Sequence, residues 1–277
     1  MLVLASMLLA VRGHAMSINN LKTKIHTAAS HKLHAPPSGS FHVEIPARLT
    51  TAVAHCDSRS FPILPSSNPL ERVTKAIARA HTPDYIAKLK STVGGLTSDT
   101  YIAPNSYLSL LSTTSAWINC VDYALTSEGP SFALCRPPGH HATKGAAMGF
   151  CLVNFAAVTA LEARGLLADR EGVAVLDIDV HFGNGSADIL KNVEGMKFAS
   201  VHQAGIYPGT GDGPSEGFNI LKLPVPAACD PSVWLKAVSA ALDFLIVEST
   251  EVLVVSIGER AKRASFEEDN NDNTSHY

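Results

Sequence analysis

The sequence lacks the features that mark several classes of protein. It has no basic excess, because 22 Lys and Arg stand against 25 Asp and Glu and the formal net charge is -3. Nucleic-acid binding requires a basic face, so direct binding of nucleic acid is not expected. The apolar run at the N-terminus, residues 1–11, is shorter than the ~20 residues needed to cross a bilayer, so no membrane partner is expected either.

Paired cysteines are also lacking. The five cysteines are odd in number and scattered, and no two of them form a C-x-x-C pattern. A disulfide framework or a cysteine zinc site is therefore not predicted, whereas buried free thiols in a reducing compartment are. The cysteines are Cys56, Cys120, Cys135, Cys151 and Cys229.

Acidic residues are missing from residues 16–40, which are rich in Ser, Thr, Lys and His, as transit peptides are. The apolar run before them has the form of a signal-peptide core, although no basic region precedes it. A mispredicted start exon is a third explanation. We therefore expect residues 1–40 to be a targeting-like or disordered segment outside the fold, with a plastid or another organelle among its destinations.

The rest of the sequence has the alternation of an α/β domain. Hydrophobic residues make up 46% of the chain and charged residues 17%, which is enough apolar content for one large core over residues 41–258. Strands alternate with helices, and this order predicts βαβ units in a mostly parallel sheet. The expected strands are 131–135, 172–180, 195–201 and 251–257, and the expected helices are 72–91 with a break at Pro83, 109–128, 154–167 and 231–248.

Polar loops follow three of these strands, at the sheet edge where α/β proteins bind ligands. In the strand predicted over 172–180, the period of two places Asp177 and Asp179 on one face, and His181 continues that spacing. Buried carboxylates need a partner such as a metal ion, and oxygen and nitrogen ligands suit Zn²⁺ or Fe²⁺. The alternative is that these side chains cap the strand end through hydrogen bonds to the backbone.

A tandem histidine and two aromatic residues lie in the other loops. His140 and His141 follow a stiff Pro-Pro-Gly turn, and histidine suits acid–base chemistry because its unperturbed pKa is ~6.5. Phe150 and Tyr207 are placed to form an apolar slot for an aliphatic chain such as that of lysine. A solvated histidine pair and ordinary aromatic core packing are the alternatives.

Together these segments resemble the zinc-dependent histone deacetylase superfamily, and its class II deacetylases and acetylpolyamine amidohydrolases more than its class I enzymes. The resemblance covers residues 41–257 and implies an arginase-like three-layer αβα sandwich with a mostly parallel sheet, of which the C-terminal part is missing. The matching stretches are FHVEIPARL (41–49), AHTPDYI (80–86), FALCRPPGHHATKGAAMGFCLVNFAAVTA (132–160), VAVLDIDVHFGNGSADIL (173–190) and FASVHQAGIYPGTGDG (198–213).

The resemblance implies roles for the residues at the matching positions. Asp179 and His181 correspond to two of the three zinc ligands of the family. His141 corresponds to the histidine that activates the zinc-bound water and later protonates the leaving amine. His140 corresponds to the electrostatic neighbour of that histidine.

Further matches surround these four residues. Asp177 and Asn184 correspond to residues that orient the two imidazoles. Asp177 also corresponds to part of a monovalent-cation site, such as one for K⁺, together with backbone atoms that include those of Ser200 and Val201. Phe150, Tyr207 and Gly149 correspond to the substrate tunnel, and Arg48 to an arginine that lines an internal channel.

The reaction implied by the resemblance is hydrolysis of N-acetyl-lysine or a related acetylated amine, so the expected partner is an acetylated protein or an acetylated small amine. The family resemblance implies the nucleus or cytoplasm as the compartment. It gives no oligomeric state.

The sequence departs from the family pattern after residue 258. The third zinc ligand of the family is an aspartate, and the corresponding position holds Arg260, whose charge would repel zinc. The loop with the oxyanion-stabilising tyrosine has no counterpart, and residues 259–277 are expected to form a divergent polar tail. A catalytically inactive homologue that acts as a binding module is therefore the alternative to an active deacetylase. An arginase-like hydrolase is a distant third, because no binuclear aspartate-rich site is found.

Overall fold

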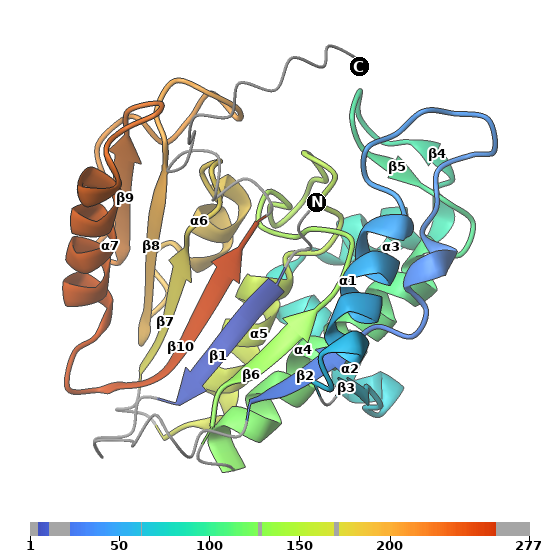
Figure 1. The fold of residues 1–277 in the computed structure, drawn as a ribbon, viewed down its shortest axis with the longest axis horizontal. Helices are drawn as coiled ribbons and strands as arrows, with labels where there is room; N and C mark the ends of the chain where they lie inside the picture. The colour runs from blue at the N-terminus through green and yellow to red at the C-terminus, as the bar shows by residue number, and fades with distance from the viewer. Residues whose placement is uncertain (1–4, 11–22, 62, 127–128, 169–171, 259–277) are drawn as a thin grey trace.

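A computed structural model describes residues 5–10, 23–61, 63–126, 129–168 and 172–258. Its main sheet has eight strands in the order β3-β2-β6-β1-β10-β7-β8-β9, which Figure 1 shows face-on. These strands are β1 (Ala5–Ala10), β2 (Lys24–Thr27), β3 (Ile63–Pro65), β6 (Ser131–Leu134), β7 (Gly172–Asp177), β8 (Met196–Gln203), β9 (Ile220–Val225) and β10 (Thr250–Ile257). A separate antiparallel pair is formed by β4 (Gly94–Gly95) and β5 (Tyr101–Ile102).

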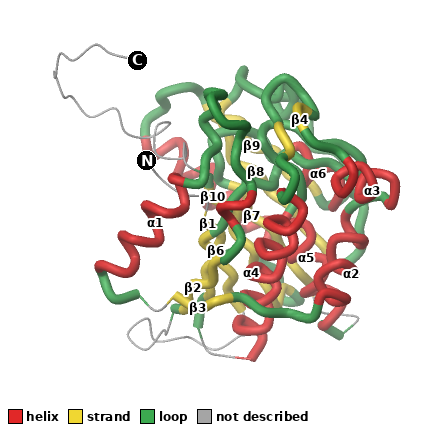
Figure 2. Tube along the Cα trace, turned by 90° about the vertical axis from the view of Figure 1, so that its right-hand side faces the viewer, coloured by secondary structure: helices red, strands yellow, loops and turns green. Residues whose placement is uncertain are grey.

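Helices cover both faces of this sheet. Figure 2 shows α1 (Ala47–Ser58) on one side of the strands, with α2 (Leu70–Ala80), α3 (Pro83–Ser91), α4 (Ser106–Thr126), α5 (Phe155–Leu166) and α6 (Asn184–Leu190) on the other. The last helix, α7 (Pro231–Leu245), packs on β7, β8 and β9. A short 3-10 turn, η2 (His31–Leu33), contacts α4.

The apolar core is divided by the sheet into clusters that explain these layers. One large cluster joins α2, α4 and α5 to the sheet and includes Ile118, Phe155 and Val254. A second cluster joins α7 to the sheet, and a third places α1 against β2 and β6. The architecture is the expected α/β sandwich, and the sheet is mostly parallel as predicted. No helix within the described ranges is long and apolar enough to span a membrane.

The N-terminal strand β1 lies in the middle of the sheet. It pairs antiparallel with β10 from Ala5↔Ile257 to Ala10↔Val252, and antiparallel with β6 on its other side. The expectation that residues 1–40 lie outside the fold therefore does not hold for Ala5–Ala10, nor for the segment that contains β2 and η2. A chargeless run suits a central strand as well as a targeting segment, so composition could not separate the two. Residues 1–4, 11–22 and 259–277, including the predicted tail, lie outside the described residues.

Removal of residues 2–10 should lower the free energy of unfolding by at least about 3 kcal/mol, because β6 and β10 would each lose a ladder of backbone hydrogen bonds. Urea unfolding followed by circular dichroism measures this change. Removal of residues 2–4 is the matched control, since it leaves Ala5–Ala10 in place. Equal stability of the two variants would contradict the central position of β1.

Candidate active site

A pocket of about 310 Å³ opens where loops leave the carboxyl ends of the parallel strands. Its wall includes eight of the residues singled out from the sequence and four others. The eight are Arg48, His140, His141, Gly149, Phe150, Asp179, His181 and Tyr207, and the others are Val43, Asp99, Pro138 and Gly258. The three loops predicted to meet at this sheet edge therefore do so.

Asp179 and His181 are brought together by a turn and not by the strand. The strand expected over 172–180 ends at Asp177, so the alternation of side chains in a strand does not extend to these two residues. Instead, Asp179 Oδ1 accepts a hydrogen bond from the backbone N–H of His181 at 2.8 Å. The same oxygen lies 3.1 Å from His181 Nδ1. This local turn brings the Asp179 and His181 side chains together, which the alternation of side chains along a strand was expected to do.

Asp179 is held in its charged form. Burial raises the pKa of this carboxyl, but the nearby His140 charge and hydrogen bonds from His181 outweigh burial and lower it to about 2. The chain at Gly258 passes close beside it, because a Cβ at that position would lie 1.4 Å from Asp179 Oδ2. Only glycine fits there, and β10 therefore delivers the chain directly to the carboxylate.

The donor atoms of this pair fit a divalent metal ion in part. Two ligands at tetrahedral positions ~2.0–2.1 Å from zinc are about 3.3 Å apart, close to the 3.1 Å that separates Asp179 Oδ1 from His181 Nδ1. An ionised carboxylate and an imidazole nitrogen are also ligands that zinc accepts. Within the described ranges, however, no group of three His, Cys, Asp or Glu side chains is placed to hold a metal. These residues thus supply two ligands.

His140 is held as an imidazolium. Its Nδ1 lies 2.9 Å from Asp177 Oδ2, and its Nε2 lies 3.8 Å from Asp179 Oδ1. Burial lowers the pKa of His140, but the two carboxylates outweigh burial and raise it to about 9. Asp177 is fully buried, and its other oxygen accepts a hydrogen bond from the Asp179 N–H at 3.1 Å. The predicted contact between Asp177 and His140 is therefore present.

His141 has the opposite protonation preference, although the two rings are adjacent, with centroids 4.0 Å apart. Burial, followed by the positive charge of His140, holds the pKa of His141 well below its usual value. Its Nδ1 lies 2.7 Å from Asn184 Oδ1, which can only accept, so Nδ1 carries the proton. Nε2 is then an unprotonated base. One member of the pair is a charged acid and the other a neutral base.

The walls of the pocket near His141 are close-fitting. Gly149 has φ +56, and a Cβ there would lie 2.5 Å from the His141 ring and 2.9 Å from the Tyr207 hydroxyl. The Tyr207 ring stands edge-on to His141, with centroids 4.9 Å apart. Phe150 lines the same pocket. Gly149, Phe150 and Tyr207 thus form a close-fitting passage beside His141, and its role as a slot for an aliphatic stem stays a prediction.

The remaining predicted residues lie nearby. Ser200 is fully buried and stands opposite Asp177 in the pairing of β7 with β8, and Val201 follows it. Their role in binding a monovalent cation stays a prediction. Arg48 lines the pocket, and its Nη1 lies 3.7 Å from Glu44 Oε1.

A buried ion pair behind the pocket was not singled out from the sequence. Arg136 and Glu44 are 1% and 0% exposed, and Arg136 Nε donates to Glu44 Oε1 at 2.9 Å. Asp99, which lines the pocket, was missed as well. The one available hint was that Glu44 and Arg136 lie inside two stretches that carry the family resemblance.

Comparison with known proteins identifies the family. The family model described as the histone deacetylase domain matches residues 42–266. The chain therefore belongs to the histone deacetylase family, a family of hydrolases that includes deacetylases and amidohydrolases. An uncharacterized protein of Synechocystis sp. is 34% identical over 232 residues, which are 80% of this chain and 76% of that protein.

Named relatives are covered less completely. The acetylpolyamine amidohydrolase of Mycoplana ramosa is 34% identical over 170 residues, which are 58% of this chain and 49% of the relative. Among solved structures, the HD domain of HDA15 superposes with a TM-score of 0.65 at 28% identity, over 76% of this chain and 63% of that one. This superposition agrees with the arginase-like fold expected from the sequence. The chain thus spans about half the length of a named amidohydrolase relative.

Proposed function

We propose that the chain is a zinc-dependent deacetylase that hydrolyses an N-acetyl amine, such as acetyl-lysine, to a free amine and acetate. The observation that carries this proposal is the pairing of an uncharged His141 with a charged His140 beside Asp179 and His181. Bound zinc would be held by Asp179 and His181 and would supply Lewis-acid polarisation of the amide carbonyl.

The two histidines would divide the proton transfers. His141 Nε2, kept free by the hydrogen bond from Nδ1 to Asn184, accepts the proton of the attacking water. The same nitrogen later returns a proton to the leaving amine. His140, kept positive by Asp177, favours negative charge on the reacting oxygen and prevents His141 from becoming protonated in advance.

The passage beside Gly149 and Tyr207 supports an acetylated group on an aliphatic chain as the substrate. Phe150 and Tyr207 contribute aromatic rings to the pocket wall, and the same wall contains the polar side chains of His140, His141, Asp179 and His181. An acetylated protein and an acetylated small amine both present such a chain. We propose a nuclear or cytoplasmic site of action and a K⁺ site at Asp177, Ser200 and Val201, and both proposals rest on the family resemblance. An organellar site of action rests instead on the composition of residues 16–40.

Purified chain supplied with excess ZnCl₂ should release acetate from an acetyl-lysine peptide or from N-acetylputrescine, measured by liquid chromatography. His141→Ala should lower the rate about 100-fold or more, since a general base is lost. The same variant should keep its zinc content, because His141 is not expected to be a ligand. Zinc binding below stoichiometry together with no turnover would refute the proposal.

A second function is favoured by one observation, which is that the described residues supply two metal ligands. A chain without a stable zinc ion would still offer the narrow pocket to an acetylated chain. It would then act as a binding module without turnover. Binding of an acetyl-lysine peptide in the presence of EDTA, with no acetate released after zinc addition, would support this function.

A further inference from the structure

The segment FHVEIPARL contains His42, which has no part in the proton transfers proposed for His140 and His141. His42 Nδ1 accepts a hydrogen bond from the Glu44 N–H at 3.0 Å. Its Nε2–H donates to the backbone carbonyl of Asp99 at 3.1 Å. Both ring nitrogens are therefore engaged, and the ring connects this segment to the loop that carries Asp99 to the pocket wall.

The same ring supports Phe150, an aromatic residue of the pocket wall. The two rings meet edge to face with centroids 5.2 Å apart, and the Tyr101 ring meets His42 at 4.7 Å. Phe150 has φ +68, a left-handed conformation that a bulky side chain rarely adopts. Such a conformation persists only where its surroundings hold it. The His42 ring and the hydrogen bond from Phe150 N–H to Thr100 Oγ1, at 2.9 Å, are contacts that hold it.

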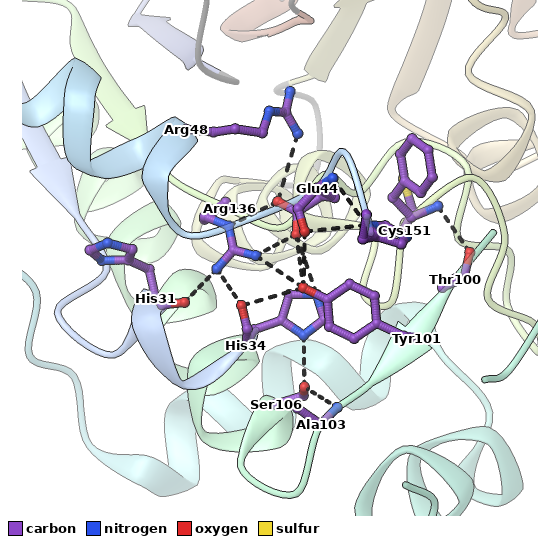
Figure 3. A network of polar contacts seen from close by, with 12 residues as sticks. His31, His34, Glu44, Arg48, Thr100, Tyr101, Ala103, Ser106, Arg136 and Cys151 are labelled. Carbon is purple, nitrogen blue, oxygen red and sulfur yellow. Dashed lines mark hydrogen bonds and ion pairs between the residues drawn. The ribbon is translucent and has the colours of Figure 1, made fainter. Parts of the chain in front are cut away.

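The position of His42 is fixed in turn by the buried ion pair. Figure 3 shows the Glu44 carboxylate between the side chains of Arg48 and Arg136, with the Tyr101 hydroxyl beside it. Tyr101 donates to the Glu44 backbone carbonyl at 3.0 Å. Arg136 also donates to the backbone carbonyls of His31 and His34. Because Glu44 is only two residues from His42, this network anchors the segment that carries the ring.

We propose that His42 is a positioning residue, which holds Phe150 and Asp99 at the mouth of the pocket and is itself anchored by Glu44 and Arg136. It touches neither the proposed metal ligands nor His141 through any contact described above. Its effect would therefore be on the shape of the passage and on substrate binding. This inference rests on the proposed function for its kinetic readout, but its structural readout is independent of activity.

The test replaces His42 by alanine and by phenylalanine and measures hydrogen exchange of the Phe150 amide by NMR or mass spectrometry. In His42→Ala, exchange at Phe150 should accelerate about 10-fold or more, because the support of its left-handed conformation is lost. His42→Phe keeps an aromatic ring but not the hydrogen bonds, so Phe150 should be perturbed less than in His42→Ala. Exchange at Val175 in β7 reports in the same sample whether each variant is folded.

His55→Ala is the matched control, because His55 is an exposed histidine on α1. It should leave the exchange of Phe150 unchanged. If the wild-type chain turns over acetyl-lysine peptide, His42→Ala should also raise KM about 10-fold with kcat changed less than about 3-fold. Unaltered exchange of Phe150 in folded His42→Ala would overturn the inference. Absence of turnover in wild type would instead overturn the proposed function.

Discussion

Replacing Arg260 with aspartate should raise the zinc affinity of the chain by about 100-fold or more. The sequence pattern after β10 places residue 260 where the family resemblance implies the third zinc ligand. Residue 260 lies outside the described residues, but the described chain reaches Gly258 beside Asp179. A carboxylate two residues later would add a negative ligand and remove a repelling cation. Competition titration against a chromogenic chelator measures the change.

The matched control for this experiment is Arg260→Ala, which removes the positive charge and adds no ligand. It should recover only a small part of the gain in zinc affinity, because relief of a long-range charge repulsion contributes less than a new coordinate bond. Asp179→Asn in the Arg260→Asp background should abolish most of the gain. Equal zinc affinity of Arg260→Asp and Arg260→Ala would show that residue 260 does not reach the metal.

Asp177→Asn should destabilise the metal-free chain by about 3–5 kcal/mol at pH 6, because it removes the partner of a buried charged histidine. An asparagine oxygen can still accept the Asp179 N–H, so the variant mainly removes the ion pair. Urea unfolding in EDTA measures the loss of stability.

The pH dependence of this effect has a defined sign. The pKa of His140 is raised to about 9 in the folded chain, above the ordinary value of 6.5. The ion pair therefore contributes fully below pH 6.5, and its contribution is lost as the pH rises through about 9. The cost of Asp177→Asn should be smaller at pH 9.5 than at pH 6. Asp243→Asn, at an exposed carboxylate on α7, should change stability by less than about 0.5 kcal/mol at either pH.

Local patterns in the sequence predicted several elements for reasons that the structure confirms. The break at Pro83 separates α2 from α3, and Thr82 caps α3 by accepting a hydrogen bond from the Tyr85 N–H at 3.4 Å. The apolar run of residues 251–257 becomes β10, which is paired on both sides. Elements without a strong period were missed, such as the seven-residue helix α6 and the strand β9.

The site was predicted unevenly. His140, His141, Asp179 and His181 could be selected because histidines and carboxylates after strands suggest chemistry wherever they occur. Glu44 could not be selected, because its function depends on Arg136, 92 residues further along the chain. A single charged residue in a sequence does not reveal whether it will be buried or which opposite charge it will meet.

The sequence by itself determined the α/β class, the polar loops at the strand ends and the family resemblance, because these depend on residue type and on short spacing. The tertiary structure alone decided that Ala5–Ala10 enters the middle of the sheet. The position of this strand depends on its pairing with β6 and β10, which lie far from it in the sequence. It also decided the opposite protonation of His140 and His141. The two imidazoles differ because the carboxylates of Asp177 and Asp179 outweigh burial at His140, whereas burial and the positive charge of His140 together keep His141 neutral.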